Sequence, residues 1–418
     1  MKAGQGGTKR PSAPYLETLA WLYGTQRFGI KLGLENAQRL FKELGVSKPG
    51  YRVLHVAGTN GKGSVCAMID SICRAQGYRS GLYTSPHLIS FRERIQVNGE
   101  IISEQDVVDG LRKIRTLTSA WNPHPTFFEI TTALALLHFR KANCEVVAFE
   151  TGLGGRLDAT NAITPTVSVL TPIDYDHQAW LGSTIAEIAA EKAGIIKHKL
   201  PVVSETQMPE AEAVIRRHAR EHEAPLTFVT DSCDATNVGL AGMHQKSNAS
   251  LAIAALYAAE ISVTDAAVTK GLATVSWPAR FERWDEQVII DGAHNPAGAR
   301  VLAETWRQTF GDTRATIILG VLSDKDVAAI WQPLAPIADR LLLPAFRSER
   351  ARPPGQLHDT IGALSPALPA ETYPSLESAL ANARKSTNPV LVTGSLHFAG
   401  EALSILRGHP EELEECAQ

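Results

Sequence analysis

Residues 52–76, RVLHVAGTNGKGSVCAMIDSICRAQ, contain the pattern that decides the fold. Arg52–Ala57 is a short β-branched and apolar run, which is typical of a buried strand. A glycine-rich turn follows, and residues 64–76 have the pattern of a helix that stops at Gly77. Strand, turn and helix in this order predict a phosphate-binding loop at the edge of a parallel α/β sheet.

The loop itself is residues 58–64, and its chemistry suits a nucleotide. Glycines let successive N–H groups turn toward one anion, and the helix N-terminus adds partial positive charge. Lys62 is expected to reach the terminal phosphates, and Ser64 to touch magnesium. The loop is shorter than the common GxxxxGK[ST] pattern, and Gly63 separates Lys62 from Ser64. The alternative is a glycine-rich turn that binds nothing.

Strand and helix patterns alternate along the whole chain, which indicates parallel α/β layers. Asn98-Gly99 predicts one hairpin within this scheme. Near residues 279–286 a second β/α series begins. We therefore expect a disordered tail (1–14), a P-loop ATPase domain with a mostly parallel sheet (15–283), and a smaller Rossmann-like α/β domain (284–418). Further strands are expected at residues 81–84, 146–151, 167–171, 202–205, 287–291, 315–321, 340–344 and 390–394, and helices at 128–141 and within 246–275.

Length and composition exclude several classes of protein. A chain of 418 residues favours two domains. A net charge of −3 without a basic cluster argues against a nucleic-acid partner. The five cysteines form no CxxC pair, which fits free thiols in a reducing compartment. No apolar run is long enough for a bilayer. We expect a cytoplasmic monomer that binds small molecules and neither membrane nor nucleic acid.

Four polar side chains follow strands or lie on a nearby helix. Glu150 ends an apolar strand, where α/β sheets place ligands and where a carboxylate suits magnesium. Ser85 follows another strand, His177 lies in the run DYDHQAWLG, and Lys192 lies on a predicted helix. The alternatives are a solvent-facing glutamate, a simple turn, a structural histidine and a solvated lysine. Their shared position at one sheet edge favours a metal and phosphate site.

A second glycine-rich loop, GLGGRLDATN at residues 152–161, directly follows Glu150. It is either a flexible connection or a loop that approaches the substrate closely. Three glycines beside Arg156, Asp158 and Asn161 favour the close approach.

With these motifs in place, the chain resembles the folylpolyglutamate synthase / dihydrofolate synthase family, a branch of the Mur-type ligases. The resemblance covers about residues 16–406. It is carried, in the family's order, by GTNGKGS, TSPHL, FRERI, ETGLGGRLDATN, a DH…LG run, EKAGI, GMHQ…NA, RFE, DGAHNP and GSL. GLGGRLDATN beside the short phosphate loop is the most specific part. His397, where a tyrosine is more usual, is a departure on the side expected for glutamate.

The resemblance implies an ATP- and magnesium-dependent ligase that joins glutamate to a folate-type carboxylate through an acyl phosphate. It implies two magnesium ions and a carbamate on Lys192. Implied catalytic residues are Lys62, Lys192, His177 and Glu150. Implied ATP contacts are Gly58, Thr59, Asn60, Gly61, Lys62, Gly63, Ser64, Asn248, Arg280, Asp291 and His294. Implied metal ligands are Ser64, Ser85, Glu150, His177 and Lys192. Implied pterin contacts are Gly24, Thr25, Gln26, Phe127, Phe128, Glu129, Leu157, Asp158 and Ala159, with the segment extending to residue 32.

Two other readings stay open at this stage. A Mur-type ligase for a different carboxylate would be expected to carry an extra N-terminal domain, and only 57 residues precede Gly58. A nucleotide-hydrolysing switch protein would want an NKxD motif, which residues 323–326 (SDKD) do not match. Within the folate family, the residues do not separate dihydrofolate synthase from folylpolyglutamate synthase activity, and possession of both is our hypothesis.

Overall fold

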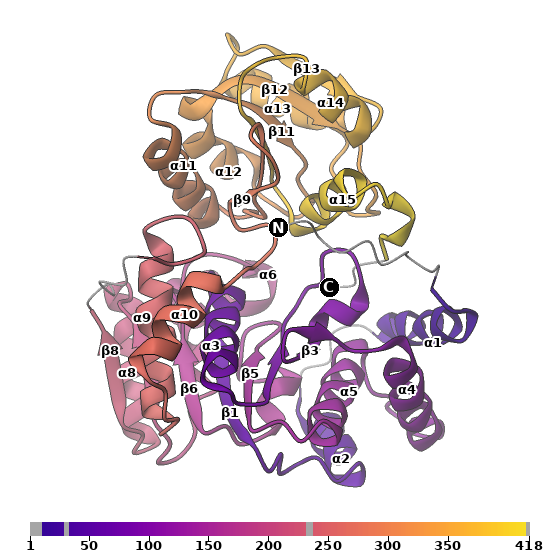
Figure 1. Cartoon of the computed structure of the whole chain (residues 1–418), viewed down its shortest axis with the longest axis vertical. Helices are drawn as coiled ribbons and strands as arrows, with labels where there is room; N and C mark the ends of the chain where they lie inside the picture. The colour runs from indigo at the N-terminus through magenta and orange to yellow at the C-terminus, as the bar shows by residue number, and fades with distance from the viewer. Residues whose placement is uncertain (1–10, 29–32, 231–236, 415–418) are drawn as a thin grey trace.

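Two α/β units, each built on its own sheet, make up the protein (Figure 1). The computed structural model describes residues 11–28, 33–230 and 237–414. The expected fold class is confirmed, because both sheets are mostly parallel and carry helices on both faces. Within the described residues, none of the helices combines the length and the apolar content that crossing a membrane would require.

The first sheet has eight strands in the order β4-β3-β2-β5-β1-β6-β7-β8. Its strands are β1 (Arg52–Ala57), β2 (Ser80–Tyr83), β3 (Ile95–Val97), β4 (Glu100–Ile101), β5 (Val146–Glu150), β6 (Val167–Leu170), β7 (Val202–Glu205) and β8 (Leu226–Val229). The central strands are buried along nearly their whole length, as parallel strands covered on both faces must be. β3 and β4 form the expected hairpin at Asn98-Gly99 and run antiparallel to their neighbours. β8 is an addition to the expected strands.

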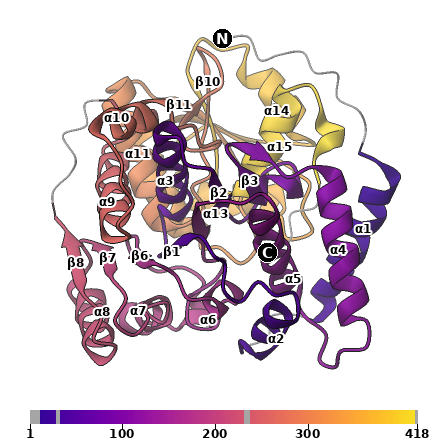
Figure 2. The ribbon, with the colours of Figure 1, turned by 60° about the horizontal axis from the view of Figure 1, so that its bottom comes forward.

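Side chains of alternate residues along the central strands contact different helices. One face packs on α3 (Lys62–Gln76), α9 (His244–Ala258) and α10 (Asp265–Thr274). The opposite face packs on α1 (Ala13–Gly24), α2 (Glu35–Glu43), α4 (Glu104–Thr118) and α5 (Phe127–Lys141). Farther along that face lie α7 (Ile185–Ala193) and α8 (Pro209–Glu221). Figures 1 and 2 both show α3, α9 and α10 grouped apart from α1, α4 and α5.

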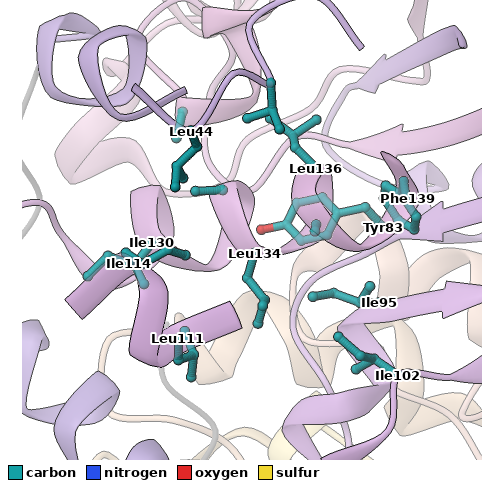
Figure 3. Close-up of a cluster of buried hydrophobic side chains, with 14 of the residues drawn as sticks. Leu44, Tyr83, Ile95, Ile102, Leu111, Ile114, Ile130, Leu134, Leu136 and Phe139 are labelled. Atoms are coloured by element: carbon teal, nitrogen blue, oxygen red, sulfur yellow. The ribbon is translucent and has the colours of Figure 1, made fainter. Parts of the chain in front are cut away.

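The core beneath α4 and α5 mixes aliphatic and aromatic side chains, and the hydroxyl of Tyr83 within it is paired. Figure 3 shows Leu111 and Ile114 of α4 facing Ile130 and Leu134 of α5, with Tyr83 of β2 beside them. The Tyr83 hydroxyl lies 3.1 Å from the hydroxyl of Thr132, so this buried phenol keeps a hydrogen-bond partner.

The second sheet has six strands in the order β13-β12-β11-β14-β10-β9. Its strands are β9 (Glu282–Arg283), β10 (Val288–Ile290), β11 (Ala315–Leu319), β12 (Ala338–Pro344), β13 (Ala370–Tyr373) and β14 (Val390–Thr393). The short edge strands β9 and β13 were not among the expected ones. One face carries α11 (Pro296–Phe310), α12 (Val327–Leu334) and α13 (Pro354–Leu364), and the other carries α14 (Leu376–Ala383) and α15 (Leu396–Leu406).

Both ends of the expected first domain differ slightly from the observed elements. Helix α1 begins at Ala13, so the last two residues of the expected tail are helical, while residues 1–10 lie outside the described residues. Strand β9 takes residues 282–283 into the second sheet, where it pairs antiparallel with β10. The domain boundary at residue 283 stays a prediction.

Helix α10 packs closely on the helix that follows the phosphate loop. A Cβ atom on Gly271 of α10 would lie 2.7 Å from the backbone nitrogen of Ile72 and 2.5 Å from its Cα. The fixed backbone of α3 cannot yield to it, so Gly271→Ala is expected to destabilise the fold by about 1–3 kcal/mol. Gly362, in α13, has no atom within 4 Å of such a Cβ, and Gly362→Ala is expected to be neutral or stabilising by about 0.5–1 kcal/mol. Urea denaturation of both variants measures this; equal effects would contradict the close helix contact.

Candidate active site

A cleft of about 610 Å³ lies between the carboxyl ends of the first sheet's strands and the second unit. Every residue expected to contact ATP or metal lines it, although the residues come from positions 58 to 294 of the chain. For the residues that follow strands of the first sheet, the parallel arrangement explains this, because strands that run the same way end at the same edge. The others reach the cleft from helices α7 and α9 and from the second unit. These lining residues are Gly58, Thr59, Asn60, Gly61, Lys62, Gly63, Ser64, Ser85, Glu150, His177, Lys192, Asn248, Arg280, Asp291 and His294.

The phosphate loop needs glycine at two places for steric reasons. Gly58 and Gly61 have φ angles of +146° and +89°, which side chains disfavour. A Cβ on Gly58 would lie 1.9 Å from Oγ1 of Thr171, and one on Gly61 would lie 2.7 Å from Oδ1 of Asn248. Helix α3 begins at Lys62, two residues before the expected start, so the positive end of its dipole lies within the loop.

Two lysines share one backbone acceptor in this loop. Lys62 Nζ donates to the carbonyl oxygens of Gly58 at 3.1 Å and Thr59 at 3.0 Å. Lys192 Nζ donates to the Gly58 oxygen at 2.8 Å from helix α7. Only 4% of Lys192 is exposed, so the solvated-lysine alternative is wrong. Burial, and then the neighbouring charge of Lys62, lower the pKa of Lys192 to about 7.

Glu150 and Ser85 form a buried oxygen pair at adjacent strand ends. Glu150 is 4% exposed, which contradicts the solvent-facing alternative, and its Oε2 accepts from the Ser85 N–H at 3.1 Å. Burial raises the pKa of the Glu150 carboxyl, and Lys62 and the Ser85 N–H oppose this. The buried Ser85 Oγ has no hydrogen-bond partner in the described part of the chain.

A hard cation fits these groups. A buried hydroxyl without a partner beside a buried carboxylate is a pair of oxygens that magnesium would satisfy. Among the described residues no three His, Cys, Asp or Glu side chains stand close enough to hold an ion by themselves. An ion here therefore needs water or phosphate oxygens as well, which is how magnesium is usually bound beside nucleotides.

Asp176 is the most heavily paired acid in the cleft, and it is not among the site residues predicted from the sequence. Its carboxylate lies 2.7 Å from Lys325 Nζ, 3.6 Å from His294 Nε2 and 3.8 Å from His177 Nε2. Burial works to raise the pKa of Asp176, but His294, His177 and Lys325 outweigh it and hold the pKa well below its ordinary value. Burial lowers the pKa of His177 to about 4, so its imidazole is neutral near pH 7.

Three cleft residues that were not predicted, Asp176, Asn295 and Lys325, lie in or beside sequence motifs that were recognised. Asp176 immediately precedes His177, and Asn295 lies within DGAHNP. Lys325 lies in the SDKD run at residues 323–326, which does not match a guanine-binding motif. The three meet because the two units face each other, which no local pattern reveals.

The turn that carries Arg280 is held by Asp291. The flanking residues Ala279 and Phe281 have φ angles of 55° and 46°, which cost non-glycine residues about 1 kcal/mol or more each. Asp291 accepts from the Phe281 N–H at 2.8 Å and from the Ala293 N–H at 2.8 Å. Asp291 therefore fixes the backbone beside Arg280 at the junction of the two units.

The residues expected to contact the pterin are not in the lining of the cleft, although Phe128 and Asp158 touch residues that are. Phe127 stacks on Tyr23 with ring centres 5.7 Å apart, and the Phe128 ring covers Gly152, where a Cβ would lie 2.4 Å from it. The Glu129 carboxylate accepts from Thr126 N at 2.7 Å as part of a helix capping box. Leu157 and Ala159 are the sequence neighbours of Asp158.

Asp158 is turned inward and braces the second glycine-rich loop. Its Oδ2 accepts from the backbone N–H groups of Gly152 at 3.1 Å and Leu153 at 2.9 Å, and its Oδ1 accepts from Thr160 N at 3.0 Å. The loop is thus fixed by hydrogen bonds and is not a flexible connection. The expected pterin role of Asp158 stays a prediction.

The N-terminal pterin segment is only partly described. Gly24 ends helix α1, Thr25 Oγ1 donates to the carbonyl of Leu22 at 2.6 Å, and Gln26 is exposed. Residues 29–32, which belong to the expected pterin segment, lie outside the described residues.

Comparison with protein families finds two matching models that follow one another along the chain. The Mur ligase middle domain matches residues 56–224, and the Mur ligase glutamate ligase domain matches residues 279–396.

Among known proteins, a dihydrofolate synthase/folylpolyglutamate synthase of Bacillus subtilis is 37% identical, covering 93% of this chain and 98% of that protein. The protein of the same name from Escherichia coli is 33% identical, covering 96% and 97%. Among solved structures, E. coli FolC in complex with DHPP and ADP matches with a TM-score of 0.86 and 32% identity over 96% of this chain and 99% of the other. The structure of the bifunctional Yersinia pestis enzyme with AMPPNP and a Mn ion matches with a TM-score of 0.85 and 31% identity, covering 96% of this chain and 100% of the other.

The low pKa of Lys192 has a consequence for stability. An unfolded lysine has a pKa near 10.5, so between about pH 7 and 10.5 the unfolded chain binds more protons than the folded one at this residue. Stability contributed by this group therefore rises with pH across that window. The difference in free energy of unfolding between wild type and Lys192→Met, in CO2-free buffer, should increase from pH 7 to 9 by at most about 1.4 kcal/mol per pH unit. Lys113→Met, on an exposed position of α4, serves as control; parallel pH curves for both variants would contradict the lowered pKa.

Proposed function

Because this chain belongs to the dihydrofolate synthase/folylpolyglutamate synthase family, we propose that it catalyses both reactions in that name. It is an ATP-dependent ligase that joins glutamate to a folate-type carboxylate. It uses a nucleotide and a divalent metal. The proposal of two activities is supported by the double names of the B. subtilis and E. coli relatives, and extends to dihydropteroate and reduced folates as acceptors.

One observation carries the chemical side of the proposal: the phosphate loop, the Glu150–Ser85 oxygen pair and buried Lys192 share one cleft between two units. A carboxylate does not react with an amine unaided. Transfer of the γ-phosphoryl group of ATP to the acceptor carboxylate makes an acyl phosphate: an O–P bond forms, the bond to the bridging oxygen breaks, and ADP leaves.

This chain's residues act mainly by position and charge in that step. Lys62, released from its carbonyl partners, would reach the β- and γ-phosphates, and the loop N–H groups would hold them. Arg280, fixed by the turn that Asp291 braces, would approach the phosphates from the junction. Asn248, whose amide donates to Gln245 at 2.9 Å, would contact the nucleotide beside Gly61.

The second step joins glutamate. Its uncharged amino group attacks the acyl carbon, the C–O bond to phosphate breaks, and the amine loses a proton as the amide forms. Water would compete for the acyl phosphate, so the second unit must cover the cleft during the reaction. Arg280, Asp291 and His294, which line the cleft from the junction and the second unit, are placed to do this.

We propose two magnesium ions, held by Ser64, Ser85, Glu150, His177 and a carbamate on Lys192. When bound, magnesium supplies positive charge that offsets the charge developing on the transferred phosphoryl group. A carbamate forms only on a neutral amine, and the pKa of Lys192 near 7 supports its formation there. The pterin contacts named from the sequence, a monomeric state, and the lack of membrane or nucleic-acid partners belong to the same proposal.

The deciding experiment is ATP-dependent phosphate release with magnesium and glutamate, using dihydropteroate, a reduced folate and a muramyl nucleotide as acceptors. Release with the first two acceptors, and no more than background with the third, is the expected result. Release with only one folate acceptor would reduce the proposal to that single activity. Release with the muramyl nucleotide alone, or release indifferent to every acceptor, would overturn the folate assignment.

The carbamate has its own test. Lys192→Ala should lower turnover by roughly 100-fold or more, since it removes a metal oxygen ligand from the site of charge transfer. A small carboxylic acid such as acetate in solution should restore part of the turnover by filling the space. Lys62→Ala is the matched control, because it removes a positive charge from the same carbonyl acceptor and should gain nothing from acetate. Full activity of Lys192→Ala without additive would refute the carbamate.

A further inference from the structure

Asn295 connects the second unit to the phosphate loop and to Asp176 through three of its four side-chain hydrogen bonds. It is the N-cap of helix α11, and its Oδ1 accepts from Gly298 N at 2.8 Å and from Asn60 Nδ2 at 3.2 Å. Its Nδ2 donates to Asn60 Oδ1 at 3.0 Å and to Asp176 Oδ2 at 3.0 Å. Only 2% of Asn295 is exposed, so these bonds are protected from water.

Capping by itself does not explain the amide at this position. Aspartate and serine cap a helix as well as asparagine does, because the cap needs only a side-chain oxygen. Only an amide can also donate to the Asp176 carboxylate while completing a reciprocal pair with Asn60. The identity of residue 295 therefore follows from contacts between the units, and not from the helix that it begins.

A second residue of the second unit, Lys325, also contacts Asp176. Its Oδ1 accepts from Lys325 Nζ at 2.7 Å, and the two side chains are only 9% and 11% exposed. Lys325 comes from the loop that precedes helix α12, whereas Asp176 follows strand β6 of the first sheet. Solvent and salt screen a charged pair only weakly when it has little exposure. Removing Lys325 would therefore leave the Asp176 carboxylate buried without a compensating charge, which costs free energy.

Helix α11 has another link to the loop, one turn farther along (Figure 1 shows α11 in the second unit). Arg300 pairs with Asp174 at 2.8 Å. The backbone N–H of Asp174 donates to Thr59 Oγ1 at 3.0 Å, and that hydroxyl donates back to the Asp174 carbonyl at 3.0 Å. Both Thr59 and Asn60 of the phosphate loop are thus tied to one helix of the opposite unit.

We propose that Asn295, Asp176 and Lys325 are positioning residues that seat helix α11 on the phosphate loop and so align Asn60 and His177 for phosphoryl transfer. The proposal rests on the ligase function above for its catalytic readout. Asn60 lies within the loop, and the His177 ring is 3.8 Å from the same carboxylate that Asn295 and Lys325 hold. The buried Asp176 carboxylate therefore connects the second unit to His177, and Asn295 connects it to the phosphate loop through Asn60.

A positioning role predicts a particular kinetic pattern. Most of the residues expected to contact the nucleotide, namely the phosphate loop and Asn248, belong to the first unit. Loss of the docking contacts should therefore weaken ADP binding less than it lowers kcat, by about threefold. The kcat should fall roughly 10- to 100-fold, the range expected when a buried hydrogen bond to a charged group is replaced by repulsion. The KM for ATP should change less than kcat does, because the lost contacts act mainly on alignment and the phosphate loop itself is kept.

Asn295→Asp is the central variant. It keeps the oxygen that caps α11, so the melting temperature should stay near that of wild type, but it sets a carboxylate against Asp176. Asn388→Asp is the matched control, since the Asn388 amide also donates to an aspartate, Asp339, at 2.9 Å, on an exposed part of the second unit. With ADP bound, Asn295→Asp should be more extended than wild type in small-angle X-ray scattering, and Asn388→Asp should not.

The donor and the acceptor of the hydrogen bond between Asn295 and Asp176 can also be exchanged. In the double variant Asn295→Asp with Asp176→Asn, the amide of residue 176 becomes the donor, and the new carboxylate can still accept from Asn60 Nδ2 and Gly298 N. The donation to Asn60 Oδ1 is not restored, so the rescue is partial. The kcat of the double variant should exceed that of either single variant by at least about fivefold, as coupled neighbours do when a lost contact is restored. A double variant no better than the worse single variant would overturn the proposal.

The scattering measurement separates this proposal from the proposed function. If wild type shows no ligase turnover with any acceptor, the function fails, while the scattering comparison still tests the docking contacts. If wild type is an active ligase and Asn295→Asp matches it in kcat and in scattering, the docking proposal fails alone. Lys325→Met, which leaves Asp176 buried without its cation, should follow Asn295→Asp in both measurements.

Discussion

The backbone carbonyl of Gly58 is the point on which the active site depends. It lies just after the end of strand β1 and accepts hydrogen bonds from both Lys62 and Lys192. Residue 58 must be glycine, because any side chain there would collide with Thr171. Two ammonium groups converge there because a short glycine turn exposes the carbonyl, helix α3 begins at Lys62, and helix α7 ends just after Lys192. The arrangement weakens the hold of Lys192 on its proton and keeps Lys62 close to where phosphate would bind.

Burying so many ionisable groups has an energetic cost that the structure offsets in different ways. Asp176 is compensated by a lysine, two histidines and an amide, and stays ionised. Glu150 and Asp158 are buried with hydrogen-bond donors, and burial raises the pKa of both. Asp158 is satisfied within its own loop, whereas Glu150 stands beside a serine oxygen that lacks a partner. This difference separates a structural carboxylate from one suited to a cation.

Local patterns were sufficient wherever a segment's own chemistry determined its structure. The phosphate loop, the strand ends and the Asn98-Gly99 hairpin were predicted because each depends on glycine geometry or on short runs of β-branched residues. The edge strands β8, β9 and β13 were not predicted, because such strands are partly exposed and carry no continuous apolar run. The resemblance identified which strand-end residues would meet, and all of its ATP and metal positions line one cleft.

By itself, then, the sequence determined two α/β units, a phosphate loop and a set of polar strand ends, since these follow from glycine positions and from hydrophobic periodicity. It also identified the family through motifs in a specific order. Only the tertiary structure decided that Lys192 is buried against Gly58, and that Asn295 and Lys325 reach Asp176 across the cleft. Those contacts join residues more than 100 positions apart, the first within one unit and the others between the two units. Burial and charge pairing at such distances arise from tertiary packing, which has no local sequence pattern.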